Sequence, residues 1–228
     1  MLDVDIKGLF RKLNPYSRKV FENAVGLCVS RTHYEVAVDH VLSILLDDPS
    51  NDVGQLLHHF GINPSPLLGE LQRGLEKMKS GNSGRPVFSP RLLEWIGDAW
   101  LLGSVEYADG AVRSGHLFSV LAMHPDRYTA VDLDRYFEGV KLDELKRDFY
   151  RLTGASREAA EAASAGGAEA KAGAPGRPVE ETAIGRFMID FTEKARQNEI
   201  DPVFGRREIP PDDRHPGASA EEQPDRGG

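Results

Sequence analysis

Histidine is the residue type whose spacing in this sequence first suggests chemistry. His58 and His59 are adjacent, and His40 and His116 occupy equivalent positions of an internal repeat. A metal site needs ligands that converge on one point, whereas neighbouring side chains of a helix diverge by about 100 degrees. His58 and His59 therefore cannot hold one ion from a regular helix. For His40 and His116 we expect a place at a helix start, with a hydrogen bond to the turn, and we predict no metal site.

Arrangements of serine, aspartate and glycine that support catalysis are also missing. Ser114 lies before a glycine and a histidine, but no G-x-S-x-G segment is present that would expose a serine on a strand-to-helix turn. The acidic pairs Asp47-Asp48 and Asp212-Asp213 are interpreted as solvated charge. No G-x-x-x-x-G-K-[ST] segment is present, so a complete phosphate-binding loop is missing. We predict that the chain as it stands is not an enzyme and needs no cofactor.

Composition excludes several further classes of protein. The chain has 228 residues and a formal net charge of −8, which argues against binding nucleic acid through clustered Lys and Arg. No run approaches the roughly 20 apolar residues of a membrane-spanning helix, and charges interrupt the N-terminus where a secretory signal would be apolar. We therefore predict a cytoplasmic protein without a membrane contact. The single cysteine, Cys28, excludes an intramolecular disulfide and is expected to be a buried, unreactive thiol.

The elements that carry these residues form two similar copies. Asn23-Ala24 aligns with Asp98-Ala99, and His40-Val41-Leu42 aligns with His116-Leu117-Phe118, which gives a period of about 75 residues. Apolar residues recur at helical spacing in each copy, so we predict an all-α fold of two pseudo-repeats of about four helices with an extra N-terminal helix. Asn14-Pro15 and Ser89-Pro90 supply helix caps. Tyr34 to Val38 is the one strand candidate and is interpreted as a turn.

The composition changes along the chain and predicts four segments. Residues 1–155 carry the helical repeat, and residues 156–182 are an Ala- and Gly-rich linker, although the first third of that linker could extend a helix. Residues 183–209 return to apolar patterning. Residues 210–228 form a Pro-, Asp- and Gly-rich tail without an apolar period, which we expect to be disordered.

Two apolar stripes have helical spacing and could serve either as core or as a binding surface. The first lies at the N-terminus and the second lies at the entry to the second copy, and their members are Leu2, Ile6, Leu9, Phe10 and Leu13, then Phe88, Leu92, Trp95, Ile96 and Ala99. Most such stripes are core. The first stripe is on a short helix that has no partner in the repeat, so its apolar side is a candidate wall of a groove for another helix.

The segments LFRKLNPYSRKVFENA, LCVSRTHYEV and SPRLLEWIGDAWLL resemble the double-repeat N-domain of Clp unfoldases. Within that family the chain is most similar to the ClpV group, the AAA+ ATPases that recycle the sheath of type VI secretion. The resemblance implies a module that binds a sheath-subunit helix in a hydrophobic groove and delivers it to the ATPase pore. By this resemblance the groove residues are expected to be Leu9, Leu13, Phe88, Leu92 and Trp95. The fragment is expected to be monomeric and its parent hexameric.

Two other functions compete with sheath docking. One is the N-domain of a ClpB-like general disaggregase, a chaperone domain that would bind unfolded clients and lack the extra leading helix. The other is a working nucleotide-binding enzyme, which the missing phosphate loop disfavours.

A second resemblance lies beyond the linker, where FMIDFTEKARQNEIDPVFGRREI is similar to the entry of the first AAA+ module of the Clp family. The resemblance implies an adenine-binding element, here incomplete, at Asp201, Pro202, Val203, Phe204, Gly205 and Arg206. The sequence departs from the family at Pro210. If residues 210–228 are encoded by suitable synonymous codons, deletion of one base recovers RQMIDIL and KNNPI, which resemble the family's approach to its phosphate loop. We hypothesise that a single-base insertion truncated a longer ATPase, and the nucleotide sequence of the gene tests this.

Overall fold

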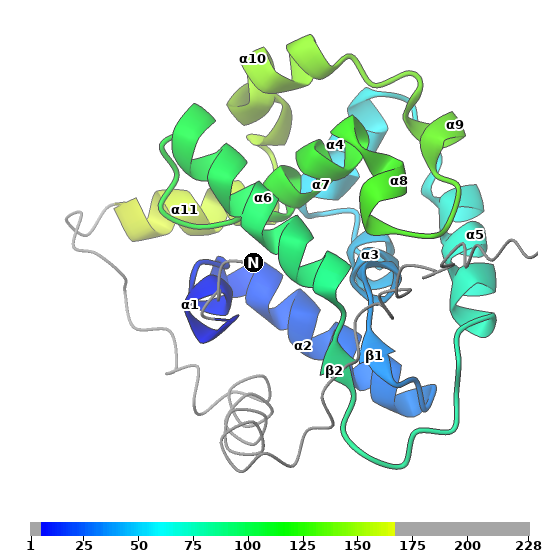
Figure 1. Cartoon of the computed structure of the whole chain (residues 1–228). Coiled ribbons are helices and arrows are strands. Elements are labelled where there is room, and N and C mark those ends of the chain that lie inside the picture. The colour runs from blue at the N-terminus through cyan, green and yellow to red at the C-terminus, as the bar shows by residue number, and fades with distance from the viewer. Residues whose placement is uncertain (1–5, 167–228) are drawn as a thin grey trace, which may run out of the picture.

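The computed structural model describes residues 6–166, and this part of the chain is mostly helical, as predicted (Figure 1). Helix α1 (Ile6–Arg11) precedes the first copy of the repeat. The first copy contains α2 (Pro15–Ser30), β1 (Glu35–Val36), α3 (Val38–Asp47), α4 (Asp52–His59) and α5 (Pro64–Glu76). The second contains β2 (Val87–Phe88), α6 (Pro90–Glu106), α7 (Ser114–Met123), α8 (Pro125–Tyr128), α9 (Asp134–Phe137) and α10 (Leu142–Thr153). Helix α11 (Arg157–Gly166) follows.

The first long helix of each copy begins with the same kind of N-terminal cap. The Asn14 side chain accepts a hydrogen bond from the Ser17 N–H at 2.7 Å at the start of α2, and the Ser89 hydroxyl accepts one from the Leu92 N–H at 3.2 Å at the start of α6. A proline occupies the first turn of each helix. The predicted repeat and its caps are confirmed. The copies differ after α3 and α7, because the second copy has two four-residue helices, α8 and α9, where the first has α4.

The prediction that Tyr34 to Val38 forms only a turn is wrong. Strand β1 pairs in parallel with β2, with Glu35 opposite Val87 and Val36 opposite Phe88. A second, isolated parallel bridge joins Leu13 to Val112. The lead-in to each copy thus pairs with the segment before the inner helix of the other copy. Two-residue pairings are too short to show an alternating pattern, so the sequence carries no signal for them.

One hydrophobic core joins the two copies. Its largest fully buried side chains include Phe10 of α1, Phe21 of α2, Trp95 of α6 and Phe118 of α7. The Trp95 indole donates a hydrogen bond to the Leu117 carbonyl at 2.9 Å, which satisfies its polar atom inside the core. Within residues 6–166, no helix combines the length and the apolar character needed to cross a membrane.

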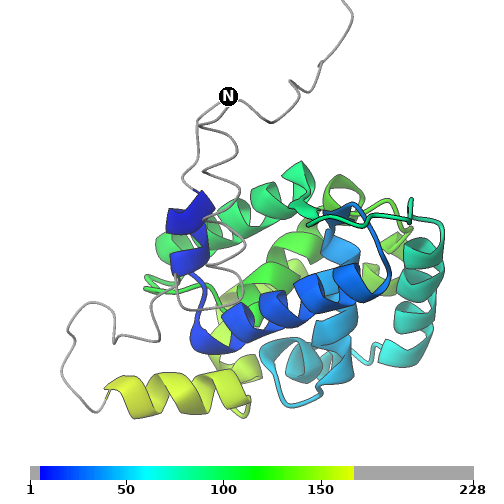
Figure 2. The same ribbon diagram turned by 90° about the horizontal axis from the view of Figure 1, so that it is seen from below.

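The start of the predicted linker is corrected, because α11 begins at Arg157 and packs beside α4 (Figure 2). Ser156 and Glu158 are 2% and 1% exposed, so the first turn of this helix belongs to the folded domain rather than to a tether. This helix agrees with the expected helical extension into the first third of the linker. The remaining linker, the 183–209 segment, the adenine element at Asp201–Arg206 and the tail lie outside the described residues.

Candidate partner-binding surface

Helix α1 packs against the rest of the domain mainly through the aromatic side chain of Phe10. Phe10 is 1% exposed, and its ring centroid lies 5.5 Å from that of Phe21 and 4.8 Å from that of Phe88. The chain after α1 is held by the Leu13 bridge to Val112, where the Val112 N–H donates to the Lys12 carbonyl at 2.6 Å. Helix α1 therefore has a defined position beside α2 and α6, as both views show (Figures 1 and 2).

Four of the five predicted groove residues are core residues. Leu13, Leu92 and Trp95 are 2%, 0% and 0% exposed, and Leu9 is 8% exposed. Side chains with almost no exposed surface cannot contact a partner in this conformation. The expectation that these four residues line the wall of a groove is therefore corrected: they lie in the core beneath the surface. Phe88 is half-buried and stays a candidate contact. Of the first stripe, Ile6 is half-buried and Phe10 buried, and Leu2 lies outside the described residues.

Two apolar residues of α6 that lie outside both predicted stripes are exposed. Leu101 is 60% exposed and Val105 is 70% exposed, one turn apart on α6. Trp100 beside them is half-buried, and the Lys12 ammonium lies 4.3 Å from the centre of its ring. We call Ile6, Phe88, Trp100, Leu101 and Val105 the α1–α6 face.

A signal for this face was present in the sequence. Ala99, Trp100, Leu101 and Leu102 are consecutive, and four consecutive helical residues span about 300 degrees. A helix that buries one face cannot bury all four, so one of them must point to solvent. Exposed apolar residues on adjacent turns of one helix are suited to contact with another helix.

The paired histidines are structural. His40 Nδ1 accepts a hydrogen bond from the Ala37 N–H at 3.1 Å, and His116 Nδ1 accepts one from the Arg113 N–H at 3.3 Å. The expectation of a histidine bound to its own helix-start turn is confirmed in both copies. Burial, with the neighbouring His33, lowers the pKa of His40 to about 4, so the ring is neutral at pH 7. Among the residues that the structure describes, no cluster of His, Cys, Asp or Glu forms a metal site.

Buried charged side chains form one polar cluster among the described residues. Arg113 donates from Nε and Nη2 to the two carboxylate oxygens of Asp52, each at 2.8 Å. The Glu158 carboxylate accepts from the Asn14 amide at 2.7 Å, from the Ser114 N–H at 2.9 Å and from the Asp52 N–H at 3.2 Å. Burial raises the pKa of Glu158, and the Asp52 charge raises it further. Asp52 and Glu158 are 0% and 1% exposed, so no substrate reaches them.

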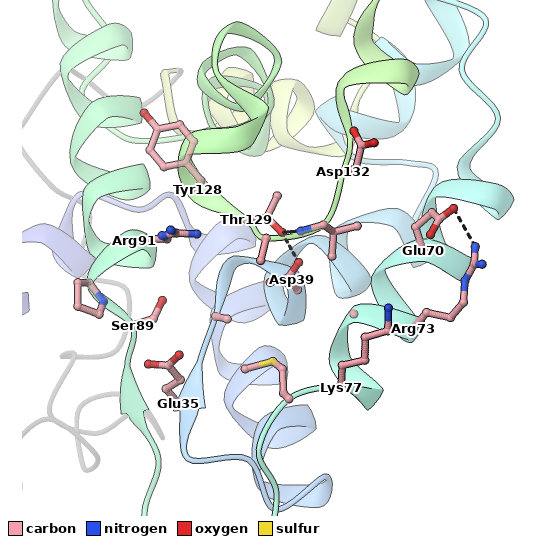
Figure 3. Close-up of a pocket in the computed structure, with 16 residues that line it drawn as sticks. Glu35, Asp39, Glu70, Arg73, Lys77, Ser89, Arg91, Tyr128, Thr129 and Asp132 are labelled. Carbon is pink, nitrogen blue, oxygen red and sulfur yellow. Dashed lines mark hydrogen bonds and ion pairs between the residues drawn. The ribbon is translucent and has the colours of Figure 1, made fainter.

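A second candidate site is a pocket of about 780 Å³ between the starts of α3 and α6, the last turn of α5 and the loop after α8 (Figure 3). Its lining includes Asp39, which accepts a hydrogen bond from the Thr129 hydroxyl and whose pKa burial raises. Arg91 and Lys77 add positive charge. The one lining serine, Ser89, is occupied as a helix cap. The lining thus offers mixed charge for binding, and its serine and threonine hydroxyls are held by a helix cap and by the Asp39 carboxylate.

The prediction that Cys28 is buried is confirmed. Cys28 is 0% exposed, and burial raises the pKa of its thiol to about 11. A thiol with that pKa is almost wholly protonated at pH 7 and is a poor nucleophile.

Comparison with known protein families shows which family the repeat belongs to. The model of the Clp repeat (R) N-terminal domain matches residues 12–131, which include most of both copies. The chain belongs to this family. The match begins after α1, so α1 stands in front of the part that the family model covers. The matched region is the N-terminal domain of Clp proteins and not their ATPase module.

Relatives of the Clp N-domain family include both predicted groups. The AAA+ ATPase ClpV1 of Pseudomonas aeruginosa is 30% identical over 216 residues, which cover 91% of this chain and 24% of the relative. The chaperone ClpB of Yersinia enterocolitica is 30% identical over 207 residues, 88% of this chain and 23% of the relative. The chain therefore spans about a quarter of the length of these relatives.

Solved structures of ClpV N-domains share the fold. The N-domain of ClpV from Vibrio cholerae is 32% identical, with a TM-score of 0.64, over 69% of this chain and 95% of that chain. A complex of a ClpV N-domain with a VipB peptide is also 32% identical, with a TM-score of 0.62, over 69% of this chain and 97% of that chain.

Proposed function

We propose that this chain is the substrate-recognition domain of a ClpV-like AAA+ unfoldase and binds a helix near the N-terminus of a type VI secretion sheath subunit. The observation that carries this proposal is the similarity to a ClpV N-domain in complex with a VipB peptide. Helix α1 adds support, because it lies outside the common family match and contacts α6, the helix that carries the exposed Leu101 and Val105. By this proposal the domain delivers the sheath subunit to the ATPase for disassembly and recycling.

The binding surface that we propose is the α1–α6 face. Leu101 and Val105 supply exposed apolar area, and Trp100 and Phe88 supply half-buried aromatic surface beside α1. One short helix buries little area and must be ordered when it binds, so the affinity of a single domain is expected to be modest. Several copies in a hexameric parent would raise the effective affinity.

We also propose that the chain has no catalytic activity of its own. Asp52 and Glu158 are enclosed, and in the open pocket Ser89 caps a helix while the Thr129 hydroxyl donates to Asp39. The ATP-dependent step belongs by this proposal to the longer parent, and no cofactor is bound by the chain itself.

The test is a calorimetric titration of the 228-residue chain with a synthetic helix from the N-terminal region of the cognate sheath subunit. Leu101→Asp and Val105→Asp place a charge on the α1–α6 face and are expected to abolish saturable binding without loss of the folded state. Leu142→Asp is the matched control, because Leu142 is also exposed, at 37%, but lies on α10. Binding that all three variants retain would exclude this face as the docking site.

A ClpB-like role is the other outcome of the same titration. Failure to bind the sheath helix, combined with binding to an unfolded client such as a reduced and carboxymethylated protein, would assign the domain to a general disaggregase.

A further inference from the structure

The two copies of the repeat differ on the exposed sides of their first long helices. Helices α2 and α6 begin at equivalent positions of the repeat, so each residue of α2 has a counterpart on α6. Residues three or four positions apart lie on one side of a helix. One such set on α6, which we call the α6 stripe, is Glu94, Asp98, Leu101 and Val105, and its counterparts on α2 are Lys19, Asn23, Gly26 and Ser30. The two helices therefore share a place in the repeat and present different surfaces.

The second half of the α6 stripe is apolar and exposed. Leu101 is 60% and Val105 is 70% exposed, whereas their counterparts Gly26 and Ser30 have no large apolar side chain. Helix α2 forms and packs into the same core without such a pair, so the fold does not require it. Exposed side chains of this kind add little to stability. Contact with a partner accounts for the pair, because two residues one turn apart match an apolar pair on another helix.

The middle of the α6 stripe is already satisfied inside the domain. Asp98 Oδ2 accepts a hydrogen bond from the Tyr128 hydroxyl at 2.6 Å and lies 3.2 Å from Arg127 Nη2. Both partners belong to α8, so these contacts connect α6 to that helix. Asp98 thus has its own counter-charge, and it limits the apolar pair on the side toward the start of α6.

Glu94, at the start of the α6 stripe, is a charge that a partner can reach. It is exposed, and among the described residues it forms no ion pair. Arg91, one turn earlier, lines the pocket that contains Asp39. The axial distance from Glu94 to Leu101 is two turns of helix, about 10 Å. The counterpart of Glu94 on α2 is Lys19, so the two copies carry opposite charge at this position.

We propose that the α6 stripe binds one amphipathic helix, which places two apolar residues against Leu101 and Val105 and a Lys or Arg about two turns away, beside Glu94. This inference rests on the proposed function and specifies the chemistry of the partner. The net charge of −8 on the chain favours the approach of a partner with positive charge. The equivalent side of α2 rejects the same helix, because it lacks the apolar pair and carries Lys19 in place of Glu94. Of the two copies, only the second carries such a site.

The experiment changes charge on both partners. The full 228-residue chain is titrated with the cognate sheath-subunit helix and with the same helix in which each Lys and Arg is replaced by Gln. Each titration is run near 0.05 M and near 0.5 M NaCl, where the screening length falls from about 14 Å to about 4 Å. The protein variants are Glu94→Gln and Glu94→Lys, the second of which gives α6 the charge of its counterpart on α2. The control is Glu138→Gln, because Glu138 is also exposed but follows α9.

At low salt, Glu94→Gln is expected to weaken binding of the sheath helix about three-fold and Glu94→Lys about ten-fold, because the first removes one exposed charge pair and the second adds repulsion. At high salt, both losses are expected to shrink to less than about two-fold. The neutral helix is expected to bind the wild type about three-fold more weakly and not to distinguish it from Glu94→Gln, while the control binds like the wild type. Melting temperatures equal to that of the wild type show that the variants fold.

The outcomes separate this inference from the proposed function. If the sheath helix binds the wild type and Glu94→Lys equally well at low salt, charge selection is overturned while sheath docking stands. If Glu138→Gln weakens binding as much as Glu94→Gln, the effect belongs to net charge, and the assignment of Glu94 is overturned. If the wild type binds neither helix at either salt concentration, the proposed function itself fails.

Discussion

Replacing Glu158 by alanine is expected to destabilise the whole domain, although the residue lies in a stretch of Ala-rich sequence. Its carboxylate accepts hydrogen bonds from the Asn14 amide, from the Ser114 N–H and hydroxyl, and from the Asp52 N–H. These donors come from the start of α2, the start of α7 and the start of α4. Glu158 therefore connects α11 by hydrogen bonds to helices of both copies.

The magnitude follows from the burial of those donors. Removing one member of a buried charged network costs about 3–5 kcal/mol, because the groups left behind lose their partners inside the protein. Relief of repulsion with Asp52 offsets part of this loss. We expect Glu158→Ala to lower the free energy of unfolding by about 3 kcal/mol, which lowers the melting temperature by roughly 6–12 °C for a domain of this size.

The assay is urea unfolding of the 228-residue chain, followed by tryptophan fluorescence, since Trp95 is fully buried in the core. The control is Glu161→Ala in the same helix. Glu161 pairs with Arg157 on the helix surface, a contact worth about 0.3–0.5 kcal/mol. A loss for Glu158→Ala no larger than for Glu161→Ala would refute the claim that α11 is part of the domain.

Three further predictions follow from burial and charge. Leu92→Ala is expected to cost about 2–5 kcal/mol of unfolding free energy and Leu101→Ala less than about 0.5, because Leu92 is 0% and Leu101 60% exposed; urea unfolding that ranks them the other way would contradict the core assignment. The pKa of His40 falls from 6.5 to about 4 on folding, so its contribution is full above pH 6.5 and is lost as the pH falls toward 4. Relative to His40→Asn, the wild type should lose about 2 kcal/mol between pH 8 and pH 5, and equal slopes would contradict a buried neutral ring. Cys28 is expected to resist a thiol reagent at pH 7 in the folded chain and to react on unfolding, and rapid labelling of the native chain would contradict its burial.

Much of the fold was predictable because its signals are local. The caps at Asn14 and Ser89 and the histidines at two helix starts act within one turn of sequence, and all four have the expected hydrogen bonds. The β1–β2 pairing was missed because its partners are about 50 residues apart and only two residues long. Glu158 was missed for a similar reason, since its partners lie up to 144 positions away.

The sequence pattern indicated apolar stripes on α1 and α6, but not which of their residues are exposed. A helical stripe shows which residues share a face, and it does not show which neighbour covers that face. Leu92 and Trp95 proved to be covered by the rest of the core, whereas Leu101 and Val105 on the same helix were left exposed. The expectation that α1 forms part of the surface stays a prediction.

The most direct test of sheath docking is amide hydrogen exchange of the full chain with and without the sheath-subunit helix. We predict slower exchange in α1 and in the second half of α6, which contains Leu101 and Val105, with no change in the pocket around Asp39 and Thr129. Binding accompanied by protection only around that pocket, with α1 and α6 unchanged, would contradict the account.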